Sequence, residues 1–490
     1  MPDQRNLSNH SYPNYRYNLY VILLIICANV FLYTISENHK FPKEQSRTLT
    51  SGFSHDKARH FIFFYYYKNL FPVGTSERIN SYSEKEADRI LNTKGNTLFT
   101  EKEHWTRLGE HARILMYMPN AIIKGSPENP STKLFNSMFF TIALIVFFLG
   151  FSLSGMRIFA TVLVFIVIAT PFFWFEIYEN NNVFGLLTVL FLFITGLNIN
   201  ILLKRIPIYK IVFVSIFSGM MIAFFSEIRG ELAIVMVSLL ILYVFTEHYR
   251  LVYKSLFVIL LFTNFIISRN LVFNYFNNKF DRANEIVLNK GGNPYIYPRT
   301  QGHKIWHPIF CGLGDFDKKY GYEWNDKVAY KYAIPILKEK YNINVNYSNQ
   351  YYTDDYYDSQ KMYYIKFDEI PEYEQIMKDK VVSDIKSDPG WYISILLRRV
   401  VRILTVTLPV PYAGWLILPI VFVLFRRKEK VFLKMILISM PLSLTPLLIF
   451  SGGNATFNSF FPYILVSILV SEIILLLNKG KKSNKIELQK

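Results

Sequence analysis

The chain carries ten apolar runs of the length that a membrane-spanning helix requires, and this feature limits its fold more than any other. Each run has roughly 15 to 22 residues, enough for a helix to cross about 30 Å of hydrocarbon. Apolar residues make up 51% of the 490 residues and charged residues 19%, against about a quarter in soluble proteins. We therefore expect an all-α polytopic membrane protein with about ten transmembrane helices. The runs lie near residues 17–35, 134–153, 157–177, 183–203, 211–226, 232–246, 254–268, 409–425, 431–450 and 459–477.

The charges between the runs predict one orientation in the membrane. Short basic connections, such as Arg157 and Lys204–Arg205, alternate with neutral or acidic ones, such as 178–182 and 227–231. Because basic loops stay in the cytoplasm, the alternation places both termini there. We expect the inner membrane of a bacterium as the location. The net charge of +17 then belongs to cytoplasmic loops and to contact with anionic headgroups of the lipid bilayer, so we expect no nucleic-acid partner.

The order of runs and loops predicts a single membrane domain with two large outer loops, the first (36–133) and the fourth (269–388). No internal repeat or low-complexity linker divides it. The expected parts are a cytoplasmic N-terminus (1–16), a transmembrane module that includes both loops (17–408), a C-terminal group of three transmembrane helices (409–477) and a basic cytoplasmic tail (478–490).

Two local signals predict helices beside the apolar runs. Ser83 followed by Glu86 fits a capping box, so a helix is expected to begin near Ser83 in the first loop. After Asp388-Pro389, apolar positions are interrupted by arginines, including Arg399. This pattern is typical of a helix at the membrane interface whose arginine side chains extend toward water.

Four short segments follow one another in a characteristic order, namely PFFWFEIYENNN (171–182), SEIRGE (226–231), SRN (268–270) and DIKSDPGWYISILLRRVVRIL (384–404). The first segment is similar to an outer turn that ends in a polar, acidic cluster. The second and third are similar to outer ends of spans that carry an arginine, and the fourth is similar to a return from the fourth outer loop into the membrane. With the layout of residues 17–408, they resemble the GT-C superfamily of integral-membrane glycosyltransferases. This superfamily includes the protein O-mannosyltransferases and the bacterial enzymes that transfer aminoarabinose to lipid A.

The resemblance implies an inverting transferase that moves one sugar from a polyprenyl-phosphate donor to a glycan, lipid or protein acceptor on the outer side. Such enzymes use a carboxylate near the outer end of the first span as general base. Glu37 is the first acid after that span and is the expected catalytic residue. The family usually has an aspartate there, often in an acidic pair, whereas Glu37 is followed by Asn38 and His39.

Two arginines at span ends are the expected binding groups for the donor phosphate. Arg229 and Arg269 each follow an apolar run at the depth of a lipid headgroup. A guanidinium group can bind two phosphate oxygens through parallel hydrogen bonds. The alternative is that each arginine anchors its helix at the interface or forms an ion pair with Glu227 or Glu231.

The stretch from His303 to Asp326 combines histidines, carboxylates, glycines and aromatic rings. Pro308 and the glycines argue against a helix and favour a folded loop, in which aromatic faces beside carboxylates suit a sugar. The alternative is a structural plug over the outer cavity. The residues expected to shape the substrate are His303, His307, Asp315, Tyr322, Glu323, Trp324 and Asp326.

No metal site and no cofactor are assigned from this stretch. A divalent cation stays as an alternative, because His303 and His307 lie four residues apart and the stretch ends in acidic residues such as Asp326. Cys311 has no evident base beside it in the sequence, so we do not expect it to act as a nucleophile.

Other classes of membrane protein fit parts of the pattern. A polymerase or ligase of polyprenyl-diphosphate glycans usually has one large late loop, and this chain has two. A non-catalytic glycolipid transporter or scaffold is the third reading. A proton-coupled transporter would carry carboxylates or histidines midway through its spans, and these are scarce here.

Overall fold

The structure is a computed structural model, and its described part is almost entirely helical. One small antiparallel hairpin pairs β1 (Asn344–Asn346) with β2 (Tyr352–Asp354). The all-α prediction is therefore confirmed for the described part of the chain. The structure describes residues 15–38, 60–70, 81, 83–92, 111–125, 127–128, 130–170, 177–178, 185–289, 305–346, 352–354, 370–405, 412–426, 430–449 and 461–487.

In the described part of the chain, a helix lies in every predicted apolar run, and six helices are long and apolar enough to cross a membrane. The chain is therefore a helical membrane protein. The six are α1 (Tyr15–Asn38), α5 (Lys133–Leu153), α8 (Leu186–Leu203), α9 (Ile208–Ser226), α11 (Leu251–Asn289) and the segment Lys430–Leu448, which contains α17 (Lys430–Ser439), η7 (Met440–Ser443) and α18 (Leu444–Leu448). The shorter apolar helices are α6 (Arg157–Ala169), η3 with α10 (Gly230–Ile234, Val235–Val244), η6 with α16 (Ala413–Leu416, Ile417–Arg426) and the first part of α19 (Phe461–Glu487).

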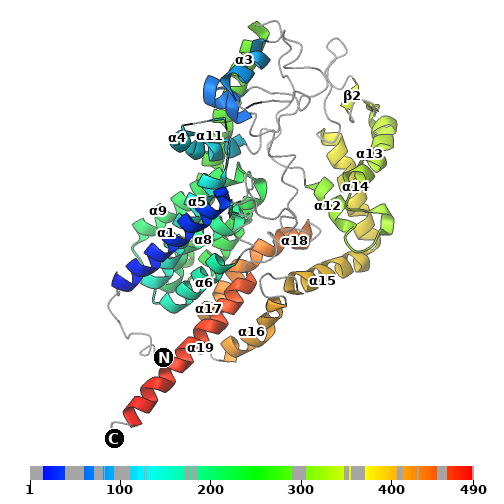
Figure 1. Ribbon diagram of the computed structural model, residues 1–490. Helices are drawn as coiled ribbons and strands as arrows, with labels where there is room; N and C mark the ends of the chain where they lie inside the picture. The colour runs from blue at the N-terminus through cyan, green and yellow to red at the C-terminus, as the bar shows by residue number, and fades with distance from the viewer. Residues whose placement is uncertain are drawn as a thin grey trace.

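Small residues let the central helices approach closely (Figure 1). Helices α5 and α8 meet at Gly150 and Gly196, and a Cβ at Gly196 would lie 2.6 Å from the Cα of Phe147. Helix α9 meets α11 in the same way at Gly219. Close backbone approach of this kind drives helix association in lipid, where hydrophobic burial gains little.

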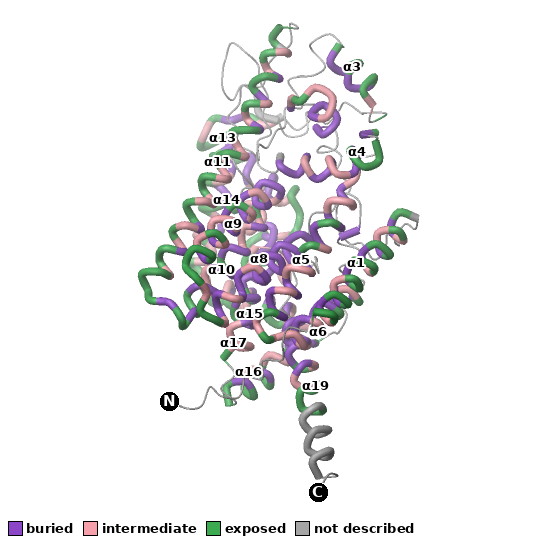
Figure 2. Tube along the Cα trace, turned by 90° about the vertical axis from the view of Figure 1, so that its left-hand side faces the viewer, coloured by how far each residue is buried: buried purple, intermediate pink, exposed green. Residues whose placement is uncertain are grey.

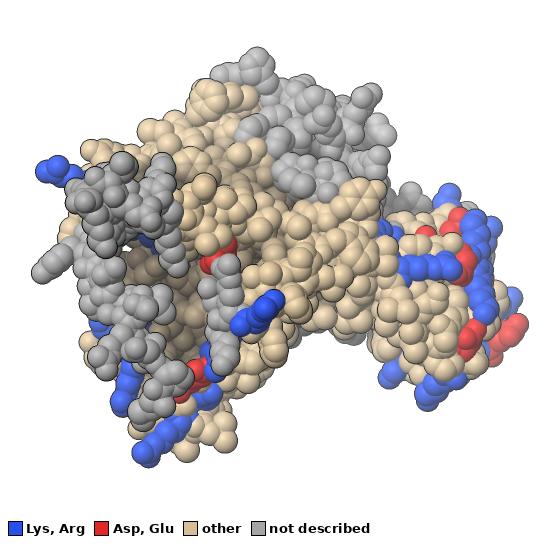
Figure 3. Space-filling view, turned by 90° about the horizontal axis from the view of Figure 1, so that it is seen from below, with Lys and Arg blue, Asp and Glu red and all other residues tan. Residues whose placement is uncertain are grey.

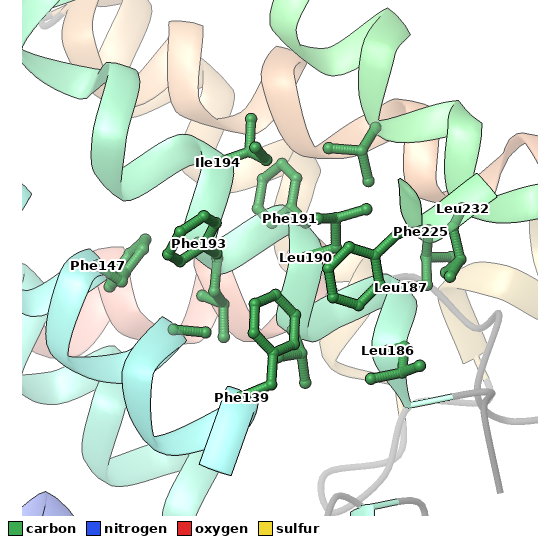
Figure 4. Close-up of a cluster of buried hydrophobic side chains, with 14 of the residues drawn as sticks. Phe139, Phe147, Leu186, Leu187, Leu190, Phe191, Phe193, Ile194, Phe225 and Leu232 are labelled. Atoms are coloured by element: carbon green, nitrogen blue, oxygen red, sulfur yellow. The ribbon is translucent and has the colours of Figure 1, made fainter. Parts of the chain in front are cut away.

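Helix α8 is the most deeply buried of the long helices (Figure 2). Aromatic rings pack around it (Figure 4). Phe139 of α5 stacks on Phe225 of α9 with ring centroids 4.5 Å apart, and Phe193 of α8 lies 5.5 Å from Phe139. Three helices that are distant in the sequence are thus held together by one set of side chains.

A buried polar network crosses the same bundle. Asn198 of α8 donates from Nδ2 to Ser218 Oγ of α9 at 2.9 Å, and the Tyr243 hydroxyl of α10 donates to Asn198 Oδ1 at 3.0 Å. Ser215 of α9 bonds the same tyrosine hydroxyl at 2.9 Å. Because hydrocarbon offers no partner to polar groups, this network fixes the rotation of the three helices relative to one another.

The bundle has two distinguishable ends. At the end that we call the loop end, Glu37 meets Lys133, Phe135 approaches Phe225, and Glu227 meets Arg269. At the other, which we call the basic end, cations bond the ends of neighbouring helices. These cations are Lys204 on Leu153 O, Lys254 on Val244 O, Lys434 on Phe245 O and Arg157 over the Tyr17 ring.

A smaller helical unit lies to the right of the bundle in Figure 1 and consists of α12 (Trp306–Leu313), η4 (Lys319–Gly321), α13 (Asp326–Tyr341), α14 (Pro371–Ser387) and α15 (Pro389–Thr405). We call it the loop unit. It has its own core, which includes Phe310, Tyr322, Ala333, Met377 and Ile395. Seen from below, it mixes positive and negative side chains, while the face that joins it to the bundle is largely uncharged (Figure 3).

Candidate functional site

Glu37, the expected general base, lies in the last turn of α1 at the loop end and contacts two lysines. Lys124 closes α4 (Met118–Lys124), which follows η2 (His111–Tyr117), and its ammonium donates to Glu37 Oε2. Lys133 Nζ lies 3.7 Å from Oε1 and also donates to Ser36 O at 2.8 Å. The side chain of Glu37 is 30% exposed. Both carboxylate oxygens of Glu37 therefore face lysine ammonium groups.

Arg269 lies on the side of α11 that faces the end of α9. Its Nε donates to Glu227 Oε1 at 2.8 Å, and the Glu227 side chain is 4% exposed while that of Arg269 is 33% exposed. The buried carboxylate orients the guanidinium group. Within the described residues, no hydrogen bond is made by the two terminal nitrogens of Arg269.

Arg229 lies two residues beyond Glu227 and is bound to a different carboxylate. Its guanidinium contacts Glu231 at 3.0 Å, and both side chains are about 15% exposed. Both expected phosphate-binding arginines thus form ion pairs, as the alternative interpretation required, and the two pairs come together where α9 ends.

The prediction that residues 306–313 do not form a helix is wrong, because α12 covers them. Pro308 lies in the first turn, where its missing N–H needs no partner. Glu374 Oε1 of α14 accepts from the backbone N–H groups of Ile305 and Trp306 at 2.7 and 2.8 Å, which satisfies the free end of the helix. A side chain at Gly312 would overlap the carbonyl of Ile449, so the glycine permits close packing on the end of α18.

The helix brings His307 and Cys311 onto one face. His307 Nε2 lies 3.1 Å from Asp326 Oδ1, and Cys311 Sγ lies 3.8 Å from His307 Nε2 and 3.9 Å from Asp326 Oδ1. On the other side of the ring, Nδ1 lies 2.5 Å from the Tyr373 hydroxyl of α14. Among the described residues, His307, Cys311 and Asp326 form a group whose ligand atoms lie close enough together to hold a metal ion. Burial, followed by the charge of Asp326, raises the pKa of the Cys311 thiol to about 12.

Asp315 is placed where no substrate can reach it. Its side chain is 1% exposed and accepts from Arg399 Nε at 3.2 Å and from Arg402 Nη2 at 2.7 Å. Arg399 also donates to Gly312 O at 2.5 Å and to Leu447 O at 3.0 Å. The expectation that Arg399 extends toward water is therefore wrong, because its guanidinium links α12, α15 and α18 from within. Burial lowers the pKa of Arg399, and Asp315 opposes that shift.

The aromatic residues of the stretch divide between core and surface. Tyr322 is buried, stacks on Trp391 with centroids 5.6 Å apart and donates to Asp384 Oδ2 at 2.7 Å. Trp324 is 42% exposed. Glu323 pairs with Lys318 at 3.0 Å on the surface. His303 lies outside the described residues.

Sequence reasoning missed Cys311, Tyr373 and Arg399 as members of these clusters. For Cys311 a signal existed, because its spacing of four from His307 places both on one helix face once α12 is accepted as helical. For Tyr373 and Arg399 there was none, since each reaches its partner across more than sixty residues of chain.

No family model, no curated protein and no solved structure matches the chain.

Proposed function

We propose that the protein is a membrane glycosyltransferase that binds a polyprenyl-phosphate sugar at the loop end and passes the sugar to a glycan, lipid or protein acceptor. The observation that carries the proposal is the pair formed by Glu227 and Arg269. The buried Glu227 carboxylate binds Nε of Arg269 and leaves the two terminal guanidinium nitrogens for another anion. Guanidinium groups bind phosphate oxygens in this two-point manner.

The position of this pair along the helices supports a headgroup as ligand. Arg269 is eighteen residues after Leu251, the first residue of α11, which is about 27 Å at 1.5 Å per residue. Glu227 lies nineteen residues after Ile208, the start of α9, at about 28 Å. Both distances are close to the roughly 30 Å of a hydrocarbon layer, so a span that starts at one boundary brings the pair to the other.

In this proposal, Glu37 is the general base and the basic end faces the cytoplasm of a bacterium. Cations gather at the basic end, as the positive-inside rule requires of cytoplasmic loops. Glu37 accepts the proton of the acceptor hydroxyl after its contact with Lys124 opens. Arg269 stabilises the charge that develops on the departing phosphate.

Binding and transfer are tested separately. Purified protein is incubated with undecaprenyl phosphate and examined by native mass spectrometry, and transfer is followed in membranes with a panel of undecaprenyl-phosphate hexoses radiolabelled in the sugar. We expect Arg269→Ala to weaken lipid retention at least tenfold and Glu37→Gln to abolish transfer while retaining the lipid. Lys254→Ala, which removes one positive charge at the basic end, is the matched control. Equal retention in the Arg269 and Lys254 variants refutes the phosphate site.

A non-catalytic glycolipid-binding or transport protein is the second candidate. It is favoured by one observation, that Glu37, Arg229 and Arg269 all form ion pairs with neighbouring side chains. It predicts that the lipid is retained through Arg269 but that no sugar is transferred to any acceptor. A polymerase or ligase of diphosphate-linked glycans predicts retention of undecaprenyl diphosphate in preference to the monophosphate.

A further inference from the structure

We propose that His307, Cys311 and Asp326 form a binding site for a zinc-class transition-metal ion, with three protein ligands and a fourth position open to solvent. The proposal does not depend on the glycosyltransferase assignment. It rests on the geometry of the cluster, the chemistry of its ligands and the contacts that support them.

The distances within the cluster match the edges of a tetrahedral site. Zinc bonds of about 2.0–2.1 Å to nitrogen and oxygen and about 2.3 Å to sulfur give ligand separations of about 3.4 Å for N–O and about 3.6 Å for S–N and S–O. The corresponding separations are 3.1, 3.8 and 3.9 Å. Each differs from the ideal by about 0.3 Å or less, which a change of side-chain torsion can supply.

The ligand types select the class of ion. A thiolate and an imidazole favour zinc and similar transition metals, whereas calcium and magnesium prefer oxygen ligands alone. An ionised thiol and carboxylate together carry two negative charges, which balance a divalent cation. The cluster keeps His307 and Asp326 from the divalent-cation alternative considered for the wider stretch and adds Cys311, which that alternative did not include.

The surroundings of His307 resemble the support that metal-binding histidines receive. Its Nδ1 is bonded to the Tyr373 hydroxyl at 2.5 Å, which fixes the ring and directs Nε2 toward Cys311 and Asp326. The ring also lies against that of Tyr330, with centroids 5.9 Å apart. Second-shell contacts of this kind orient the ring and increase the basicity of the ligating nitrogen.

Three helices converge on the site and hold it rigidly. His307 and Cys311 are one turn apart on α12, Asp326 opens α13, and Tyr373 lies on α14. The N-cap of α13 is itself fixed, because the Asn325 side chain accepts from Lys327 N at 3.0 Å. Sites built on helices keep their geometry better than sites built on loops.

Exposure indicates where the fourth ligand would enter. Cys311 is 3% exposed, the His307 side chain 20%, and the Asp326 side chain 69%. The cluster is closed on the cysteine side and open on the aspartate side. Zinc sites with three protein ligands keep such an open position for water or another ligand.

Metal content of the full-length protein is the test. The protein is purified in detergent through a tag without histidines, stripped with a chelator, incubated with zinc and measured by inductively coupled plasma mass spectrometry. We expect one zinc ion per chain. We also expect His307→Ala and Cys311→Ser to weaken binding at least a hundredfold and Tyr373→Phe to weaken it by about ten- to a hundredfold. Cys27→Ser changes the other cysteine of the chain and leaves binding unchanged.

Cobalt gives an independent readout, because a cobalt–thiolate bond produces a charge-transfer band in the near ultraviolet. We expect the band in the wild type and in Cys27→Ser and its loss in Cys311→Ser. If the cysteine variant does not fold, the exposed Asp326→Asn variant is used instead. We expect its cobalt spectrum to be weaker than that of the wild type and altered in shape. The proposal is overturned if the wild type binds no more zinc than the His307 variant, or if the cobalt band persists without Cys311.

Discussion

Replacing Asp315 with alanine should open the loop unit locally, because the carboxylate is the counter-ion of a fully buried arginine. The Asp315 and Arg399 side chains are each 1% exposed, and Arg402 is bound to the same oxygen. Removing one partner of a buried ion pair costs about 3–5 kcal/mol, because the other charge is left without compensation. At tenfold per 1.4 kcal/mol, this is a roughly hundred- to several-thousand-fold increase in local opening.

Hydrogen–deuterium exchange of the detergent-purified protein measures this opening directly. The reporting amides are those of α12 and of Gly314 and Asp315, since Arg399 binds Gly312 O. Glu323→Ala is the matched control, because Glu323 is eight residues away and its 39% exposed side chain pairs with Lys318 at 3.0 Å on the surface. An exposed pair of this kind contributes at most about 1 kcal/mol.

A double variant separates the buried charge from the loss of packing. Asp315→Ala combined with Arg399→Met removes both members of the pair, and we expect it to exchange more slowly than the single variant. The reasoning is refuted if Asp315→Ala exchanges no faster than Glu323→Ala. It is also refuted if the double variant exchanges faster than Asp315→Ala alone.

Three further changes test the packing. Gly150→Ala should overpack α5 against α8, lower the free energy of unfolding by about 1–3 kcal/mol and so lower the melting temperature in detergent. Gly230→Ala should have little effect, because nothing lies within 4 Å of the added Cβ. A double-mutant cycle of Asn198→Ala with Tyr243→Phe should give a coupling energy of about 0.6 kcal/mol and at most about 1.7, and a value of zero would exclude the polar network as a link between α8 and α10. Tyr322→Phe should lower the free energy of unfolding by about 0.5–1.5 kcal/mol, because the hydrogen bond to Asp384 is lost while Lys380 still binds that carboxylate. The Tyr320 hydroxyl is exposed, so a larger loss of stability in Tyr320→Phe would contradict this.

The membrane helices could be predicted from the sequence because their signal is local. An apolar run of suitable length has to be a helix in lipid, since no other open structure satisfies its backbone there. Ser83 also behaved as its pattern indicated, because its Oγ accepts from Glu86 N at 3.3 Å at the start of α3 (Glu84–Asn92). Predictions of this kind need only a few neighbouring residues.

The loop unit was harder to predict because its structure depends on distant partners. Pro308 and Gly312 argue against a helix when read alone, yet Glu374 caps α12 and Ile449 packs on its glycine. Arg399 looked like an interfacial arginine because its neighbours are apolar, and only the fold shows Asp315 beside it. When the partner of a charged side chain lies far away in the sequence, the neighbouring residues alone predict that the side chain points into solvent.

Helix α11 is longer than a bilayer is thick, so its far part extends beyond the membrane as a rigid rod. Its 39 residues extend about 58 Å, so about 28 Å continues beyond a hydrocarbon layer of roughly 30 Å. The far part carries residues 60–70 with it, through Phe64 against Phe276 and Leu70 N on Lys279 O. A change of about 10° in the tilt of α11 moves its tip by about 5 Å. We therefore expect the loops to lie at a different height above a thin membrane than above a thick one.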